Sequence, residues 1–437
     1  MNPKMIKKLL SRLKNDNFIK GAIFLSLVSF LGAFLNYLVH PLVARGLTIP
    51  QYGDFQALLS FLMLVGILDP VLITAITKEV STLKSQDKLA EIQSFHQKII
   101  KRFIILGLVI FCSVIILSLP IKHFFKISSL ISVILTSTIF IYNLLISANQ
   151  GILTGLQKFS QLAVNSFLSP FFRFLLVLIL VYFLGLQLVG ASLALGGTGL
   201  LSLIYGFYQI KKINFPKCQN DAYNLNFLLK YSFLTFIFLA VNQLFYILDM
   251  LAVKAVFDER LAGLYGALLT VGRIIYFIGG VLPLIMFPLV AEQTLNKSLH
   301  KYKILIKSLI FTAMAIIPVA ILMISFPELI IKTLVGEKFL PIAGYLPLFT
   351  LPMALLTFIN LLSRYFLALG QKKVSLILIV GVIIELLLLY FNNNSIGHII
   401  GSMIIAFALV NLALFIWLLF CYKRDKIALT LNLDKEK

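Results

Sequence analysis

The residues in this sequence with the clearest capacity for chemistry are charged side chains that interrupt long apolar segments. A charge at the centre of a bilayer costs at least about 2.5 kcal/mol on insertion scales, so it normally faces a cavity or a partner. Positive charge dominates this set, and arginine binds phosphate through two parallel hydrogen bonds. We therefore predict a cationic site for an anionic substrate. Its candidate residues are Arg45, Arg173, Lys254 and Arg273.

Acidic residues in the same segments suit a second task, which is the coupling of transport to an ion gradient. A carboxylate within the membrane can be neutralised by H⁺ or by Na⁺. A competing interpretation is that acids and cations merely neutralise each other between helices, as Asp249 and Arg273 would. The sequence leaves both interpretations open. The candidate coupling residues are Asp69, Asp249 and Glu385.

Local patterns explain several further residues. Asp54 follows the segment 48–51 (Thr-Ile-Pro-Gln), which is typical of a helix start with glutamine at the third position, so we expect Asp54 to stabilise the first turn. Lys254 precedes Asp258 by four residues, which is the spacing of an ion pair on one helix. Close helix packing is expected at the G-x-x-x-G pairs Gly151/Gly155 and Gly397/Gly401.

Signatures of enzymes and of bound metals are absent from the sequence. It has neither the G-x-x-x-x-G-K-[ST] loop of nucleotide hydrolases nor the H-E-x-x-H pattern of zinc proteases. Its cysteines, Cys112, Cys218 and Cys421, have no C-x-x-C spacing and indicate neither zinc nor a disulfide framework. We therefore predict a protein that is not an enzyme, has no metal site and uses no cofactor beyond a coupling ion, H⁺ or Na⁺.

The elements that must position these residues are membrane helices. Of the 437 residues, 60% are hydrophobic and 13% are charged, whereas about a quarter of a soluble domain is charged. Apolar runs of about 20 residues can each span the hydrocarbon core. The sequence predicts an all-α integral membrane protein. Its twelve expected spans are 18–44, 52–77, 99–120, 128–149, 160–184, 188–210, 228–256, 262–291, 304–326, 343–369, 374–391 and 397–421.

Basic residues predict the orientation of these spans. The net charge of +21 could suggest a nucleic-acid partner, but the lysines and arginines cluster in short segments between apolar runs, where they set topology. We predict that both termini are cytoplasmic, that no nucleic acid is bound, and that a basic amphipathic segment at 1–17 lies on the cytoplasmic leaflet. A simpler interpretation of this segment is a positive-inside anchor with no further role. In this orientation the clear basic residues outside are Lys122, Lys126, Arg260, Lys332 and Lys338.

A faint internal repeat divides the chain into halves. An offset of 210 residues aligns 53–60 with 263–270, and an offset of 214 aligns Gln157-Lys158 with Gln371-Lys372. Parallel repeats of this kind place substrate sites between their halves. The predicted organisation is a six-helix lobe at 18–210, a cytoplasmic linker at 211–227, a second six-helix lobe at 228–421 and a cytoplasmic tail at 422–437.

Short motifs along nearly the whole chain resemble those of one family of membrane proteins. The motifs are 45–55 (Arg-Gly-Leu-Thr-Ile-Pro-Gln-Tyr-Gly-Asp-Phe), 248–251 (Leu-Asp-Met-Leu), 262–267 (Ala-Gly-Leu-Tyr-Gly-Ala), 287–289 (Phe-Pro-Leu) and 368–372 (Ala-Leu-Gly-Gln-Lys). Their pattern is similar to that of the polysaccharide transporter family, which includes the O-antigen and teichoic-acid flippases of the multidrug/oligosaccharidyl-lipid/polysaccharide exporter superfamily.

The resemblance implies two six-helix lobes that form a V around a central cavity. It implies a flippase that carries an undecaprenyl-pyrophosphate-linked oligosaccharide from the inner to the outer leaflet of the bacterial inner membrane by ion-coupled alternating access. Arg45 and Asp249 lie in the matching motifs themselves, whereas Lys254 and Arg273 are assigned by their local context. We expect a monomer surrounded by membrane lipids, with polysaccharide polymerase machinery as a candidate partner.

Two alternatives come from other functional classes. A cation-coupled multidrug exporter of the same superfamily would bind cationic compounds in a cavity dominated by acids, whereas cations are in excess here. A membrane glycan polymerase or transferase would carry large outer loops or soluble catalytic segments, whereas every predicted loop is about 25 residues or shorter. The flippase hypothesis fits both observations.

Overall fold

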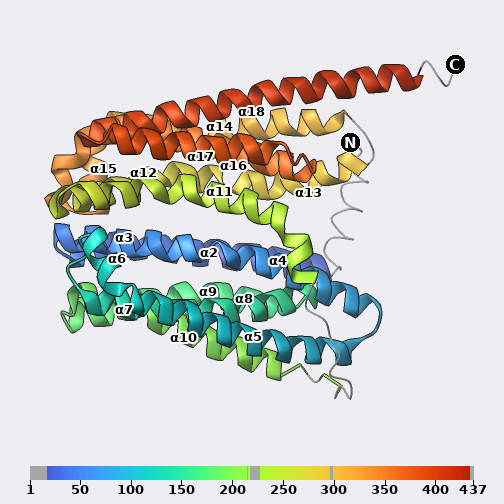
Figure 1. The fold of residues 1–437 in the computed structure, drawn as a ribbon, viewed down its shortest axis with the longest axis horizontal. Coiled ribbons are helices and arrows are strands. Elements are labelled where there is room, and N and C mark those ends of the chain that lie inside the picture. Colours follow the sequence, from blue (N-terminus) through green and yellow to red (C-terminus); the bar gives the residue numbers. More distant parts are fainter. Residues whose placement is uncertain (1–16, 214, 217–226, 296–298, 434–437) are drawn as a thin grey trace. The chain divides into compact units, whose positions relative to one another are not determined.

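The computed structural model describes residues 17–213, 215–216, 227–295 and 299–433, and this part of the chain is helical and contains no strand (Figure 1). It holds 12 helical segments long and apolar enough to cross a membrane. Each corresponds to one predicted span, so the all-α membrane fold is confirmed. The predicted segment 1–17 lies, except for Asn17, outside the described residues. The spans are Leu27–Gly46, Ile49–Ser85, Leu89–Ile116, Leu130–Gly155, Phe159–Phe183, Gln187–Lys211, Phe236–Val256, Glu259–Thr294, His300–Ser325, Glu337–Ala368, Val374–Phe391 and Ile396–Ile427.

The chain divides into two compact units. Unit 1 comprises Met1–Leu47 and Val65–Phe233, and unit 2 comprises Thr48–Leu64 and Leu234–Lys437. The predicted first lobe, 18–210, included residues 48–64, whereas the structure assigns this segment to unit 2. Close backbone packing explains the difference, because a Cβ atom on Gly263 would overlap the carbonyl oxygen of Ile49. Helix α3 (Ile49–Val65) therefore packs as part of the second half of the chain.

The long helices of unit 1 run roughly in one common direction (Figure 1). Helices α2 and α9 lie along each other, because Gly32 lets the backbone at Ser166 approach so closely that a Cβ atom would overlap it. A short π-helical segment, η1, continues α9. The elements of unit 1 are α2 (Asn17–Gly46), α4 (Leu68–Ser85), α5 (Leu89–Ile116), α6 (Ser118–Phe124), α7 (Leu130–Ser137), α8 (Ile139–Gly155), α9 (Phe159–Val177), η1 (Leu178–Phe183) and α10 (Gln187–Lys211).

The two G-x-x-x-G pairs behave differently. On α8, Cβ atoms at Gly151 and Gly155 would lie 2.7 Å from Ile76 and 2.6 Å from Val80 of α4, so the predicted close packing is confirmed. On α18, a Cβ atom at Gly401 would meet nothing within 4 Å, and one at Gly397 would be in ordinary contact. The prediction is wrong for this second pair because no neighbouring backbone approaches that face of the helix.

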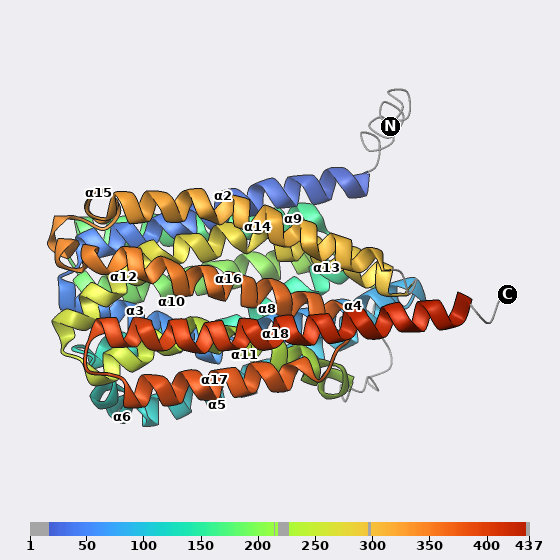
Figure 2. The ribbon, with the colours of Figure 1, turned by 90° about the horizontal axis from the view of Figure 1, so that it is seen from above.

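Unit 2 surrounds an aromatic core. The rings of Phe245 and Phe407 meet edge to face at 5.5 Å, and those of Tyr265 and Phe349 at 6.0 Å. Helices α17 and α18 lie side by side in both views (Figures 1 and 2). Besides α3, the elements are α11 (Phe227–Val256), α12 (Glu259–Gly279), α13 (Val281–Leu295), α14 (His300–Ser325), α15 (Pro327–Leu334), the 3₁₀ segment η2 (Glu337–Tyr345), α16 (Leu346–Ala368), α17 (Val374–Phe391) and α18 (Ile396–Leu433).

Candidate functional site

Arg273 and Asp249 form a buried pair between α12 and α11 in unit 2. Arg273 Nη2 donates to Asp249 Oδ1 at 3.3 Å, and its guanidinium lies 3.9 Å from the centre of the Tyr246 ring. The carboxylate also accepts from the backbone N–H of Met250 at 2.7 Å and from the hydroxyl of Tyr265 at 3.0 Å. The structure thus brings together two predicted residues of opposite charge, which neutralise each other between helices.

Lys254 is neutralised by a carboxylate from a distant part of the chain. Its Nζ lies 2.5 Å from Asp54 Oδ1, and the exposed side-chain fractions are 0% for Lys254 and 1% for Asp54. Such burial requires the opposite charge, because a lone ammonium or carboxylate in a dry interior loses its hydration without compensation. The close approach of α3 to α12 at Gly53 and Gly263 brings Asp54 into unit 2.

Both local explanations of these charges are therefore wrong. Lys254 does not pair with Asp258, which instead caps α12 by accepting from the backbone N–H of Leu261 at 2.8 Å. Asp54 is not the first-turn residue of its helix. That end is closed by Thr48 and Gln51, whose side chains each bond the other's backbone N–H, as the helix-start pattern predicted. Spacing along the sequence suggested Asp258 as the partner of Lys254, whereas the packing of the helices brings Asp54 to it.

A neutral polar network lies on the same helix pair and was missed by sequence reasoning. The hydroxyls of Tyr52 and Thr270 are 2.5 Å apart, and Gln56 Nε2 donates to both, at 2.7 and 2.8 Å. A signal was present, because the repeat offset that aligned 53–60 with 263–270 marks the segments that meet here. The network fixes the register of α3 on α12.

Glu385 on α17 is fully buried in unit 2, with an exposed fraction of 0%. Within the described chain, neither of its carboxyl oxygens has a hydrogen-bond partner. An ionised carboxylate in such a place would be uncompensated, so the group is held neutral by a proton or balanced by a bound cation. A role of Glu385 in ion coupling stays a prediction.

Asp69, the other predicted coupling acid outside the Arg273 pair, lies in the first turn of α4 in unit 1. It is half-buried, and Ser147 Oγ of α8 donates to its Oδ1 at 3.1 Å. A hydroxyl orients the carboxyl group without neutralising its charge. Within unit 1, the hydrogen bond from Ser147 is the contact that holds the Asp69 carboxyl group, and a role of Asp69 in ion coupling stays a prediction.

Arg173 on α9 is the predicted cation whose surroundings differ most from those of unit 2. It is half-buried, and its Nη1 donates to the amide oxygen of Asn36 on α2 at 2.9 Å. Among the described residues, no carboxylate lies within ion-pair distance of Arg173, and its Nε has no partner. Within the described chain, the guanidinium is therefore contacted by a neutral amide and by no carboxylate.

Arg45 occupies the last turn of α2, where a positive side chain is favoured by the helix dipole. It is exposed, and the nearby Tyr182 hydroxyl donates to the carbonyl of Leu42 at 2.7 Å. Arg45 and Arg173 therefore stand on two helices that pack along each other in unit 1. A metal centre has no basis in the described residues, which contain no group of three or more potential ligands.

Comparisons with known proteins agree on family and fold. A family model described as "Polysaccharide biosynthesis protein" matches residues 18–294, and no curated protein matches the chain by sequence. Among solved structures, an inward-facing multidrug resistance MATE family transporter of the MOP superfamily has a TM-score of 0.77 at 13% identity, covering 90% of this chain and 95% of that chain. The lipid II flippase MurJ, in an inward closed conformation, has a TM-score of 0.70 at 19% identity, covering 94% and 90%.

A further MATE structure, in complex with MaL6, has a TM-score of 0.67 at 14% identity and covers 95% of this chain and 98% of that chain. At these identities the likeness concerns the fold. The family match spans more than half of the sequence, and it agrees with the resemblance carried by the motifs at 45–55 and 262–267.

Proposed function

We propose that this chain, which belongs to the polysaccharide biosynthesis protein family, is a flippase for a lipid-linked oligosaccharide. The cargo we propose is an undecaprenyl-pyrophosphate-linked glycan, carried from the inner to the outer leaflet of the bacterial inner membrane. The family supports a glycan as the cargo, and the fold shared with the lipid II flippase MurJ supports a lipid-linked one. The distribution of basic residues supports an orientation with both termini in the cytoplasm.

The observation that carries this proposal is the uncompensated charge of Arg173. A guanidinium inside a membrane span attracts an anion when no carboxylate neutralises it. Arg173 Nη1 donates to Asn36, and its buried Nε has no hydrogen-bond partner among the described residues, so the guanidinium keeps unused donor capacity that no carboxylate compensates. A pyrophosphate oxygen would accept from the guanidinium through short, charge-assisted hydrogen bonds.

Arg45 gives the substrate a second cation on the same pair of helices. Asn36, the partner of Arg173, precedes Arg45 by nine residues, which is about 13 Å along α2 at 1.5 Å per residue. We assign Arg173 as the deeper contact for the pyrophosphate and Arg45 as the contact near the outer end of the span. Lys254 and Arg273 were also predicted to bind substrate. We instead propose a structural role for both, because each forms an ion pair with a buried carboxylate.

An ion gradient is the proposed energy source. Moving one charge across the membrane potential supplies about 2.3 kcal/mol per 100 mV. We propose Glu385 as the group that takes up H⁺ or Na⁺, because neither of its buried oxygens has a hydrogen-bond partner in the described chain. Asp69 is the corresponding candidate in unit 1, where only a hydroxyl contacts it.

Export of the glycan by variants of Arg173 tests the proposal. Arg173→Ala should lower export about tenfold or more at normal protein level, since one charge-assisted contact is worth at least about 1.4 kcal/mol. Arg173→Lys should keep part of the activity because it retains charge without the fork. Arg260→Ala removes an exposed arginine from unit 2 and serves as the control.

Full export by Arg173→Ala would contradict the assignment of Arg173. The multidrug alternative gives a different pattern. Cells that express the chain would resist cationic compounds, and deletion of the gene would leave glycan export unchanged.

A further inference from the structure

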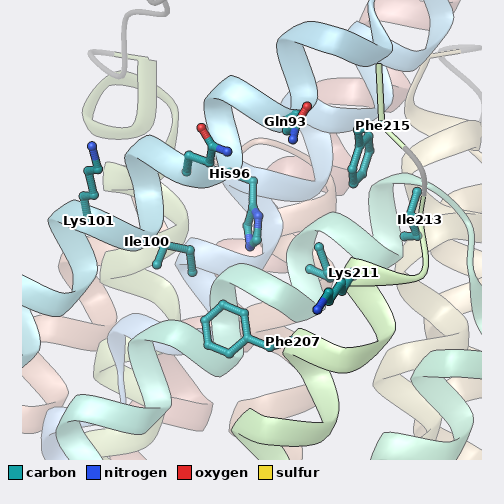
Figure 3. A pocket seen from close by; sticks show the side chains of 10 residues that line it. Gln93, His96, Ile100, Lys101, Phe207, Lys211, Ile213 and Phe215 are labelled. Atoms are coloured by element: carbon teal, nitrogen blue, oxygen red, sulfur yellow. The ribbon is translucent and has the colours of Figure 1, made fainter. Parts of the chain in front are cut away.

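A cavity of about 600 Å³ opens within unit 1, between the first turns of α5 and the last turn of α10 (Figure 3). It lies apart from Arg45 and Arg173 in the fold, because those residues stand on α2 and α9. In Figure 3, His96 of α5 points toward Phe207 of α10, and their ring centres are 6.3 Å apart. The segment that follows α10 closes one side with Phe215.

The lining of this cavity carries positive charge. Lys101 on α5 and Lys211 at the end of α10 both line it, and both are exposed. No aspartate or glutamate is among the described residues that line the cavity, so no carboxylate of this part of the chain balances the two lysines there. Such a site attracts an anion, and basic pockets between membrane helices are a recurrent place for lipid headgroups.

His96 adds a hydrogen-bond acceptor to the lining of the cavity, which suits a ligand that carries a hydroxyl as well as an anion. His96 Nε2 donates to Asn149 Oδ1 of α8 at 3.1 Å, which fixes the ring and leaves Nδ1 as an acceptor. Phosphate oxygens only accept, so they can satisfy the lysines but not His96 Nδ1. A ligand with both phosphate and hydroxyl groups satisfies both.

The surfaces next to the cavity suit acyl chains. Further along α5, Ile104 and Leu108 are exposed, and on α10 the exposed residues include Leu200 and Ile204. These apolar faces lie within the membrane-spanning segments and begin about one to two turns from the lining residues. A ligand whose polar head occupies the cavity can therefore lay hydrocarbon chains along the same two helices.

We propose that this cavity binds the headgroup of an anionic glycerophospholipid that carries free hydroxyls, with phosphatidylglycerol as the matching chemistry. Lys101 and Lys211 hold the phosphate. His96, fixed by Asn149, accepts from a headgroup hydroxyl through Nδ1, beside the Phe207 ring. The site does not depend on the proposed transport function, because none of its residues belongs to the proposed substrate path.

Native mass spectrometry of the purified full chain tests the phosphate contacts, with phosphatidylglycerol as the probe. The double variant Lys101→Gln/Lys211→Gln should weaken binding about 30-fold, which is the loss expected for two basic residues. Arg102→Gln/Lys212→Gln is the matched control, because it removes equal charge from the adjacent positions, which do not line the cavity. Equal weakening by the two double variants would overturn the site in favour of general surface attraction.

The choice of ligand is tested by His96→Phe and a panel of lipids. The native chain should bind phosphatidylglycerol about fivefold better than phosphatidic acid, because one neutral hydrogen bond is at stake, and His96→Phe should abolish that preference. Phosphatidylcholine should bind weakly. Preference for undecaprenyl phosphate over phosphatidylglycerol, or for free inorganic phosphate, would overturn the assignment to a glycerophospholipid. Equal binding of phosphatidylcholine would overturn an anion site altogether.

Discussion

In unit 2, Lys254 and Arg273 each meet a carboxylate, at 2.5 Å from Asp54 and 3.3 Å from Asp249. In unit 1, Arg173 instead donates to the amide of Asn36. The difference separates two uses of charge in a membrane protein. In a buried ion pair the two charges neutralise each other, so little attraction is left for a charged ligand. A cation that is bonded only to a neutral group still attracts an anion. We therefore expect the two ion pairs of unit 2 to contribute to stability, and we propose the cations of unit 1 for substrate binding.

Removing one member of the deepest pair should have the largest effect. Lys254→Met leaves the Asp54 carboxylate buried without a counter-charge and should lower the free energy of unfolding by about 3–5 kcal/mol. Unfolding of the purified protein in a denaturing detergent titration measures this loss. The double variant Asp54→Asn/Lys254→Met removes both charges and should recover much of it. A single variant as stable as the native chain would show that the pair contributes nothing.

Two arginines give the most direct test of the comparison. Arg273→Met should lower the free energy of unfolding by about 3 kcal/mol, because Asp249 loses its charged partner. Arg173→Met should change it by about 1 kcal/mol or less, because only a hydrogen bond to an amide is lost. Both variants are measured by the same titration, beside glycan export. Equal losses of stability at the two positions would break the distinction between the units.

Close helix packing in unit 2 should produce the next largest effect. Gly263→Ala places a Cβ atom against the Ile49 carbonyl, and overpacking of this kind costs about 1–3 kcal/mol. The change should also loosen the Asp54–Lys254 pair, because Asp54 lies on α3 and reaches Lys254 only while α3 packs closely in unit 2. Gly401→Ala is the matched control, because a Cβ atom there meets nothing within 4 Å. The packing argument fails if the control is destabilised as much as Gly263→Ala.

Glu385→Gln should have the smallest effect on stability. A carboxyl group that is already neutral resembles an amide in size and polarity, so the free energy of unfolding should change by about 1 kcal/mol or less. Transport is expected to lose its dependence on the ion gradient, because the amide cannot take up H⁺. Vesicles with and without an imposed gradient measure this. A large loss of stability would instead mean that Glu385 is ionised and paired.

The number of membrane helices was predictable because it depends on local composition. Each apolar run of about 20 residues can span the hydrocarbon core on its own, because its backbone hydrogen bonds form within the helix. The Asp249–Arg273 pair was also foreseeable as one alternative, since both residues lie within spans that follow each other in sequence. The helix start at Thr48 and Gln51 is a four-residue pattern and needed no tertiary information.

The partner of Lys254 was not predictable from the sequence, although the repeat offset had aligned the segments 53–60 and 263–270 that pack together. Asp54 and Lys254 are 200 residues apart, and their contact requires α3 to leave the unit of its sequence neighbours and pack on α12. The two glycine pairs carry the same spacing, yet Gly155 packs against Val80 while Gly401 faces open space. Spacing describes one face of one helix, whereas burial and charge pairing depend on which other helix covers that face. The cavity around His96 has the same origin, because α5 and α10 meet there only in the folded unit.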